Sequence, residues 1–142
     1  MAKVLVPFDG SDSALRAAGY AANMSLKDSE VEVTLLIVVN TQNLDFFEAS
    51  LDIKDRFFES LAESAEATLQ KASEIFNNKG ITVKKVVAKG DPATTINNYV
   101  NENNIDVIVM GTRGLTSLKG MVLGSVSQKL IHLTDKPVTL IK

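Results

Sequence analysis

Glycine is concentrated in one stretch of this sequence. Four of the eight glycines, Gly111, Gly114, Gly120 and Gly124, follow the apolar run Ile105–Met110. Glycine permits backbone conformations with positive φ and leaves room for a bulky ligand to approach the amides. The stretch therefore predicts a glycine-lined turn that binds an anion.

The end of this stretch also begins a predicted helix over residues 124–133. The first amides of a helix have no partners within it, and the helix dipole places about half a positive charge there. Ser125 and Ser127 add hydroxyl groups, while Arg113 and Lys119 add positive charge in the preceding loop. Such a helix start favours phosphate. The alternative is a surface loop followed by a serine-capped helix.

Two common nucleotide-binding motifs are absent from the sequence. No G-x4-G-K-[ST] segment occurs, which excludes a P-loop NTPase. The first predicted strand leads into Phe8–Ser11, which holds a single glycine and no G-x-G-x-x-G pattern. A dinucleotide-binding dehydrogenase is therefore not expected.

Short β-branched runs alternate with longer helical stripes along the chain. We expect strands over 3–8, 31–39, 81–88, 105–110 and 138–141, and helices over 11–25, 48–78, from 91 onward and over 124–133. The 31–39 and 105–110 runs are almost wholly apolar, as in strands covered on both faces, whereas 81–88 alternates and belongs nearer an edge. Five β-α units without a final helix predict an α/β fold, an open five-stranded parallel sheet with helices on both faces.

Helix faces and helix starts give further expectations. Ser11 or Ser13 is expected to cap the first helix, and Asp91, followed by Pro92, the third. Helical spacing predicts one buried stripe on the second helix, formed by Phe57, Leu61, Ala65, Leu69, Ala72 and Phe76. On the fourth helix it predicts a buried stripe formed by Val126, Leu130 and Leu133. The connection 41–55 is unusually apolar, with Leu44, Phe46, Phe47, Leu51 and Ile53. We expect it to cover the core, and a partner surface or a lid are the alternatives.

The predicted sheet decides where a ligand would lie. In open parallel sheets, ligands bind beyond the carboxyl ends of the strands, where the strand order reverses. If the first and fourth strands are neighbours there, Asp9-Gly10 and Gly111-Thr112 flank one crevice. Asp9 is then a candidate contact for a ligand or Mg²⁺, with helix capping as the equal alternative. His132, the single histidine, is expected to be a surface residue.

Composition restricts the class of protein. The 142 residues fit a single domain over 1–142. The absence of cysteine excludes disulfides, thiolate catalysis and thiolate metal sites. A net charge of −2 gives no reason to expect nucleic acid, and no apolar run approaches the roughly 18 residues of a membrane helix. Because the N-terminus also lacks a signal-peptide pattern, we expect a cytoplasmic protein with no membrane partner.

Several segments resemble one known family. Val4–Ser11, Asp106–Gly114, Leu123–Ser127 and Lys136–Val138 resemble the corresponding segments of the universal stress protein (UspA-like) domain. The resemblance extends over the whole chain. The spacing of the loop glycines is similar to G-x2-G-x9-G-[ST], the pattern of the ATP-binding branch, whereas the non-binding branch lacks those glycines.

This resemblance implies a strand order of 3-2-1-4-5, with ATP between the ends of strands one and four. Pro7 and Asp9 would lie beside the adenosine, and Val38 or Val39 would present backbone groups to adenine. The other implied contacts are Met110, Gly111, Thr112, Arg113 and Gly114 for the ribose and first phosphates, and Gly124, Ser125, Val126 and Ser127 for the remaining phosphates. Mg²⁺ would bridge the phosphates without a direct protein ligand. Gly120 departs from the basic or larger residue of many relatives.

The last predicted strand, Val138–Ile141, has nothing after it to cover its edge, and an exposed edge favours pairing. The family dimerises by antiparallel pairing there, so the resemblance implies a homodimer.

Three functions remain open at this point. The first is an ATP-binding regulatory or stress-response protein that acts by occupancy. The second is a slow ATP hydrolase or phosphotransfer enzyme, in which Arg113 and Lys119 would neutralise charge. No convincing base is found, so turnover should be slow or absent and no catalytic residue is assigned. The third is a dimerisation scaffold without nucleotide. The preference between ATP, AMP and cyclic AMP, and any protein partner, also stays open.

Overall fold

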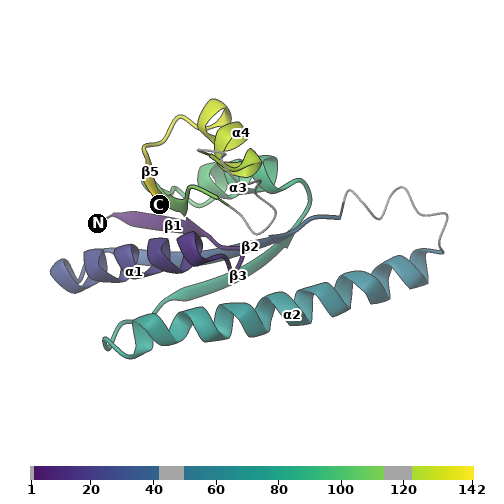
Figure 1. Ribbon diagram of the computed structural model, residues 1–142, viewed down its shortest axis with the longest axis horizontal. Coiled ribbons are helices and arrows are strands. Elements are labelled where there is room, and N and C mark those ends of the chain that lie inside the picture. The colour runs from purple at the N-terminus through teal and green to yellow at the C-terminus, as the bar shows by residue number, and fades with distance from the viewer. Residues whose placement is uncertain (1, 42–49, 114–122) are drawn as a thin grey trace.

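The computed structural model describes residues 2–41, 50–113 and 123–142 (Figure 1). Within these ranges the strands are β1 Lys3–Pro7, β2 Glu32–Val39, β3 Lys84–Lys89, β4 Val107–Gly111 and β5 Val138–Ile141. The helices are α1 Asp12–Lys27, α2 Leu51–Asn77, α3 Pro92–Glu102 and α4 Ser125–Leu133. None of these helices is both long enough and apolar enough to span a bilayer.

The strands form one parallel sheet in the order β3-β2-β1-β4-β5, which confirms the predicted fold. Val4 of β1 pairs with Val33 on one side and with Val107 on the other. The chain moves to one side of β1 through β2 and β3, and then to the other side through β4 and β5. The strand order therefore reverses between β1 and β4, where the predicted crevice would lie.

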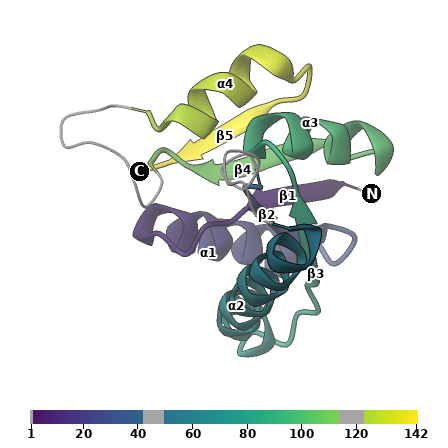
Figure 2. The same ribbon diagram turned by 90° about the vertical axis from the view of Figure 1, so that its right-hand side faces the viewer.

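Helices cover both faces of the sheet. Figure 2 shows α1 and α2 on one face and α3 and α4 on the other. Successive residues of a strand point to opposite faces. Val4 and Val6 accordingly join the buried cluster beneath α1 and α2, whereas Leu5 joins the cluster beneath α3 and α4. These two apolar layers fix the sheet between the helices, and the sheet in turn fixes the strand ends.

Side chains cap the helices where the sequence predicts caps. Ser11 Oγ accepts a hydrogen bond from the Ala14 amide at 3.2 Å, and Asp91 accepts one from the Thr94 amide at 3.1 Å. The end of α2 leads into Gly80, whose φ of +71° lies in the left-handed region. The starts of α1 and α3 and the end of α2 are therefore set by local contacts.

The third strand begins later than predicted. The expected strand started at Ile81, whereas β3 starts at Lys84. The Ile81 amide donates to the Phe76 carbonyl oxygen at 3.0 Å, so the chain is still closing the turn after α2. The ladder with β2 begins only at the pair Thr34–Lys84. The edge position predicted for this strand is confirmed.

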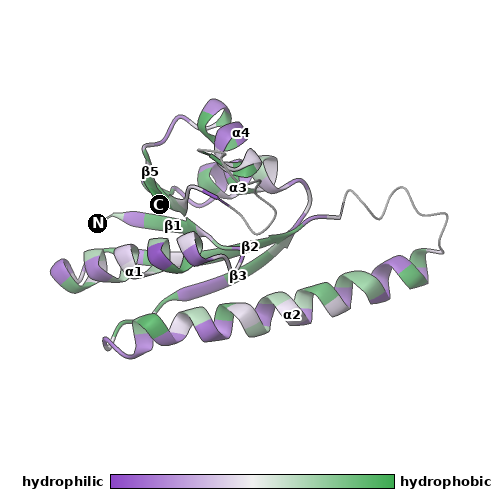
Figure 3. Cartoon of the chain, in the orientation of Figure 1, coloured by the Kyte–Doolittle hydropathy of each residue, from purple (hydrophilic) through white to green (hydrophobic). Residues whose placement is uncertain are grey.

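Three apolar side chains that were expected to be buried or to cover the core are exposed. The exposed fraction of the residue is 51% for Phe57, 79% for Leu51 and 59% for Ile53. The first turns of α2 extend beyond the ends of the strands, which leaves this apolar end without a sheet beneath it (Figures 1 and 3). Leu133, at the end of α4, is also exposed at 42%. The other apolar residues of the predicted connection, at 44, 46 and 47, lie outside the described residues.

Candidate functional site

A cavity of about 140 Å³ opens at the carboxyl ends of β1 and β4, where the strand order reverses. It is bounded by the loop after β1, the end of β2, the start of α3, the end of β4 and the start of α4. Nine predicted site residues line it: Pro7, Asp9, Val38, Met110, Gly111, Arg113, Gly124, Val126 and Ser127. The fold therefore brings together residues from four distant segments of the sequence.

Three other predicted residues, Val39, Thr112 and Ser125, are described but do not line this cavity. Val39 is buried in the cluster beneath α1 and α2, because it points to the opposite face from Val38. Thr112 is buried, and its amide donates to the Ile141 carbonyl oxygen at 2.9 Å. Ser125 is exposed in the first turn of α4. Gly114 lies outside the described residues, as do Lys119 and Gly120.

Further lining residues were not predicted from the sequence. They are Phe8, Ser11, Ala14, Leu36, Pro92 and Ile96. The period of two along β2 could have identified Leu36, since it points to the same face as Val38. Pro92 and Ile96 belong to α3, and nothing in the sequence indicates that the start of this helix reaches the end of β4. The apolar side chains give one part of the cavity a wall suited to a flat, apolar group.

Gly111 is required for a close approach between β4 and α1. A Cβ atom built at Gly111 would lie against the Ser13 hydroxyl, 2.8 Å from the Ser13 carbonyl carbon and 2.9 Å from the Ala14 amide nitrogen. Real Cβ atoms do not approach backbone this closely, so a side chain at this position would displace α1. From the sequence we predicted that this glycine gives a ligand access to the backbone. The structure shows that the close packing of α1 against β4 also requires glycine here.

Serine hydroxyls and one amide hold the end of β4. Ser127 Oγ donates to the Gly111 carbonyl oxygen at 3.0 Å, and Ser13 Oγ donates to the Arg113 carbonyl oxygen at 2.7 Å. Between them, the Gly124 amide donates to the Thr112 carbonyl oxygen at 2.6 Å. The end of β4 is therefore fixed to α1 on one side and to α4 on the other. The predicted contact of Ser127 with phosphate stays a prediction.

Asp9 lies in the turn before α1, whose N-cap residue is Ser11, and faces the cavity, so its contact with a ligand or Mg²⁺ stays a prediction. Its Oδ1 accepts a hydrogen bond from the Ser11 amide at 2.9 Å, which stabilises the turn into α1. Its side chain is nevertheless exposed and lines the cavity. Within the described ranges, no cluster of three histidine, cysteine or carboxylate side chains could hold a metal ion. Asp9 is thus a single carboxylate at the cavity, next to hydroxyl groups and Arg113.

The start of α4 faces the cavity without a side-chain cap. Gly124 is the N-cap residue, and it has no side chain that could cap the first turn of α4. The amides of this turn and the Arg113 side chain therefore offer donors and positive charge at one end of the cavity. An apolar wall at one end and an anion-binding helix start at the other suit a ligand with a flat ring and an acidic group.

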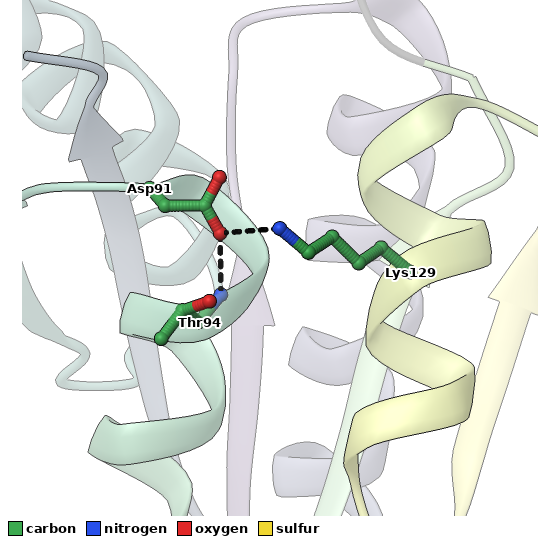
Figure 4. A network of polar contacts seen from close by, with 3 residues as sticks. All are labelled: Asp91, Thr94 and Lys129. Carbon is green, nitrogen blue, oxygen red and sulfur yellow. Dashed lines mark hydrogen bonds and ion pairs between the residues drawn. The ribbon is translucent and has the colours of Figure 1, made fainter. Parts of the chain in front are cut away.

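An ion pair joins two walls of the cavity (Figure 4). Lys129 Nζ of α4 lies 3.0 Å from Asp91 Oδ2 at the start of α3. The hydrogen bond from Lys129, together with that from Thr94, lowers the pKa of Asp91 below its ordinary value.

The reversal of strand order and the cavity at that point define an open-sheet α/β protein with its site beyond the strand ends. The model of the universal stress protein family matches residues 1–142. The chain belongs to this family. Universal stress protein YxiE of Bacillus subtilis is 31% identical over 149 residues, which cover 99% of this chain and 98% of YxiE.

Solved structures share the fold. The structure of MJ0577, a universal stress protein of Methanocaldococcus jannaschii, has a TM-score of 0.86 and 26% identity, covering 99% of this chain and 95% of that chain. A universal stress protein of Archaeoglobus fulgidus in complex with dAMP has a TM-score of 0.70 and 23% identity, covering 100% and 98%. This last likeness shows the fold alone.

Proposed function

We propose that the cavity binds an adenine nucleotide, ATP with Mg²⁺, and that the protein acts in regulation or stress response through nucleotide occupancy. The observation that carries this proposal is the meeting of nine predicted contact residues around one cavity at the strand-order reversal. These residues come from four separate segments of the chain, and they line one cavity only because the chain is folded in this way.

The adenine would lie against the apolar part of the cavity. Pro7 and Val38 line it together with Ile96 of α3. The phosphates would lie at the start of α4, where Gly124 leaves the first amides accessible and Arg113 supplies a positive charge. The family member solved with dAMP supports an adenine nucleotide as the ligand class.

Mg²⁺ would bind through the phosphate oxygens. Magnesium commonly keeps several waters and takes one or two carboxylates together with phosphates. The described residues place only Asp9 as a carboxylate on the cavity wall, which suits a metal held mainly by the nucleotide.

Occupancy rather than turnover is the proposed mode of action. Hydrolysis requires a group that orients the attacking water. Asp9 is the carboxylate available, and its Oδ1 already accepts the Ser11 amide. The second function, slow hydrolysis, therefore requires the other oxygen of Asp9 or a group outside the described residues.

The assembly that we propose is a homodimer through β5. This strand lies at the edge of the sheet, and its four residues are all partly exposed. Antiparallel pairing of β5 with the same strand of a second copy would satisfy its free edge.

The nucleotide carried by the purified protein tests the proposal. Freshly purified protein is denatured, and the released small molecules are separated on an anion-exchange column. Titration calorimetry of the stripped protein then compares ATP, AMP, cyclic AMP and adenosine in the presence of Mg²⁺. Bound or tightly binding ATP supports the proposal, and conversion to ADP during incubation favours the hydrolase. Binding of none of these ligands would leave the dimerisation scaffold.

A further inference from the structure

Two walls of the cavity are joined by residues that do not line it. Lys129 of α4 and Asp91 before α3 form the ion pair of Figure 4, with Nζ and Oδ2 3.0 Å apart. Pro92, directly after Asp91, lines the cavity, and so does Ser127, two positions before Lys129. Neither member of the pair is among the lining residues. The pair therefore makes no direct contact with the cavity and is connected to it through the two helices.

The carboxylate of Asp91 is itself held in place. The oxygen that contacts Lys129 also accepts a hydrogen bond from the Thr94 amide at 3.1 Å, in the first turn of α3. The pair therefore connects α4 to the backbone of α3 rather than to a freely rotating side chain. The exposed fraction is 21% for the Asp91 side chain and 54% for that of Lys129, so the contact is partly screened by water.

The other contacts between these helices are of a different kind. Ile96 and Val100 of α3 and Leu130 of α4 belong to one buried apolar cluster. Apolar packing is non-directional, whereas a charged hydrogen bond has a preferred distance and angle. Among the described residues, the pair is the one ion pair in the protein. It is therefore a directional contact between the start of α3 and α4, in addition to their apolar packing.

We propose that Asp91 and Lys129 are positioning residues that set the spacing of α3 and α4 at the cavity and thereby raise its affinity for an adenine nucleoside or nucleotide. This inference rests on the proposed function. The spacing acts on the wall formed by Pro92, Ile96 and Val126, so it affects binding of the ring as well as the phosphates.

A double-mutant cycle isolates the pair. Asp91→Asn removes the charge and keeps a good N-cap, because asparagine caps helices about as well as aspartate. Lys129→Met keeps the apolar stem and removes the ammonium group. Calorimetric titrations with adenosine and with ATP–Mg²⁺ are made on the wild type, both single variants and the double variant. Each single variant is expected to weaken both ligands about 1.5-fold to fivefold, the range of a partly exposed ion pair.

The double variant is expected to bind no more weakly than either single variant, because the same contact is lost in each. Lys129→Arg restores the contact and should restore wild-type affinity. Lys136→Met is the matched control, since Lys136 is exposed and the described residues give it no ion-pair partner. Circular dichroism verifies that each variant retains its helices.

Long-range attraction between charges and phosphates gives a different pattern. In that case Lys129→Met would weaken ATP, Asp91→Asn would strengthen ATP, and adenosine would be unaffected. That pattern, additive effects in the double variant, or wild-type affinities in both single variants would each overturn the positioning role while the proposed function stands. If the wild type itself binds neither ligand, the proposed function fails and this inference fails with it.

Discussion

Ser13 of α1 donates a hydrogen bond of 2.7 Å from its hydroxyl to the carbonyl oxygen of Arg113, just after β4. Ser13 also lies directly against Gly111, two residues before Arg113, where no Cβ atom fits. The first turn of α1 therefore fixes both the end of β4 and the start of the segment that carries Arg113 into the cavity. The stability of the fold and the geometry of the site depend on one contact surface.

The variant Gly111→Ala tests this contact surface. The new methyl group would meet backbone atoms of Ser13 and Ala14, which cannot move without shifting α1. Overpacking of this kind typically costs about 1–3 kcal/mol in the free energy of unfolding. Urea unfolding followed by circular dichroism measures it. An unchanged midpoint would show that α1 does not approach β4 this closely.

The variant Gly19→Ala is the matched opposite case. Gly19 lies within α1, and a Cβ atom there would meet nothing within 4 Å. Alanine favours a helix interior over glycine by about 0.8–1.0 kcal/mol, so this variant should be more stable than the wild type. The same unfolding experiment applies. A loss of stability would indicate a contact at Gly19 that the structure does not contain.

The variant Gly124→Val tests the anion-binding helix start. The backbone at Gly124 has φ −70° and ψ 163°, an extended conformation that valine adopts, so the fold should persist. A valine side chain would occupy the space of the proposed phosphates and abolish the rise in melting temperature caused by ATP–Mg²⁺. Thermal unfolding with and without ATP measures this, with Gly19→Ala as the control that keeps the rise. An undiminished rise in Gly124→Val would mean that the phosphates bind elsewhere.

The stability contributed by Asp91 should depend on pH. Hydrogen bonds from Lys129 and Thr94 lower its pKa in the folded state, so its carboxylate stabilises the fold above the unfolded-state pKa of about 3.9. This contribution is lost as pH falls through the lowered pKa. Asp91→Asn should therefore be less stable than the wild type at pH 7, and the difference should shrink toward pH 3. Urea unfolding at several pH values measures it, and a constant difference would contradict the assignment.

The homodimer prediction is tested by mass. Light scattering during size-exclusion chromatography at micromolar concentration should give twice the chain mass of 15.3 kDa. Pairing of β5 edges requires no ligand, so the same mass is expected with and without ATP. A monomeric mass under both conditions would remove the dimer.

The strands of the sheet could be predicted from the sequence because each strand corresponds to a short run of apolar residues. The apolar runs over 31–39 and 105–110 correspond to β2 and β4 with shifts of one or two residues. Asp91 and Gly80 mark a helix start and a turn through local conformational preferences. The strand order came from the family resemblance, since periodicity alone does not indicate which strands are neighbours.

Other features depend on tertiary contacts that the sequence does not record. Helical spacing places Phe57 on the apolar stripe of α2, but only the position of the sheet decides that this end of the helix is exposed. Ile96 belongs to the buried apolar cluster between α3, α4 and the sheet, and its place on the cavity wall follows from how α3 packs against β2 and α4. The packing role of Gly111 likewise requires the position of α1.

The hydrogen bond of 2.6 Å between the Gly124 amide and the Thr112 carbonyl oxygen joins the two sides of the connection from β4 to α4. The two end points of this connection are thus held together by a hydrogen bond between described residues. Loop-closure entropy changes by only about 0.6 kcal/mol for each doubling of length. We therefore expect that changes in chain length between Arg113 and Leu123 leave the sheet and its helices in place.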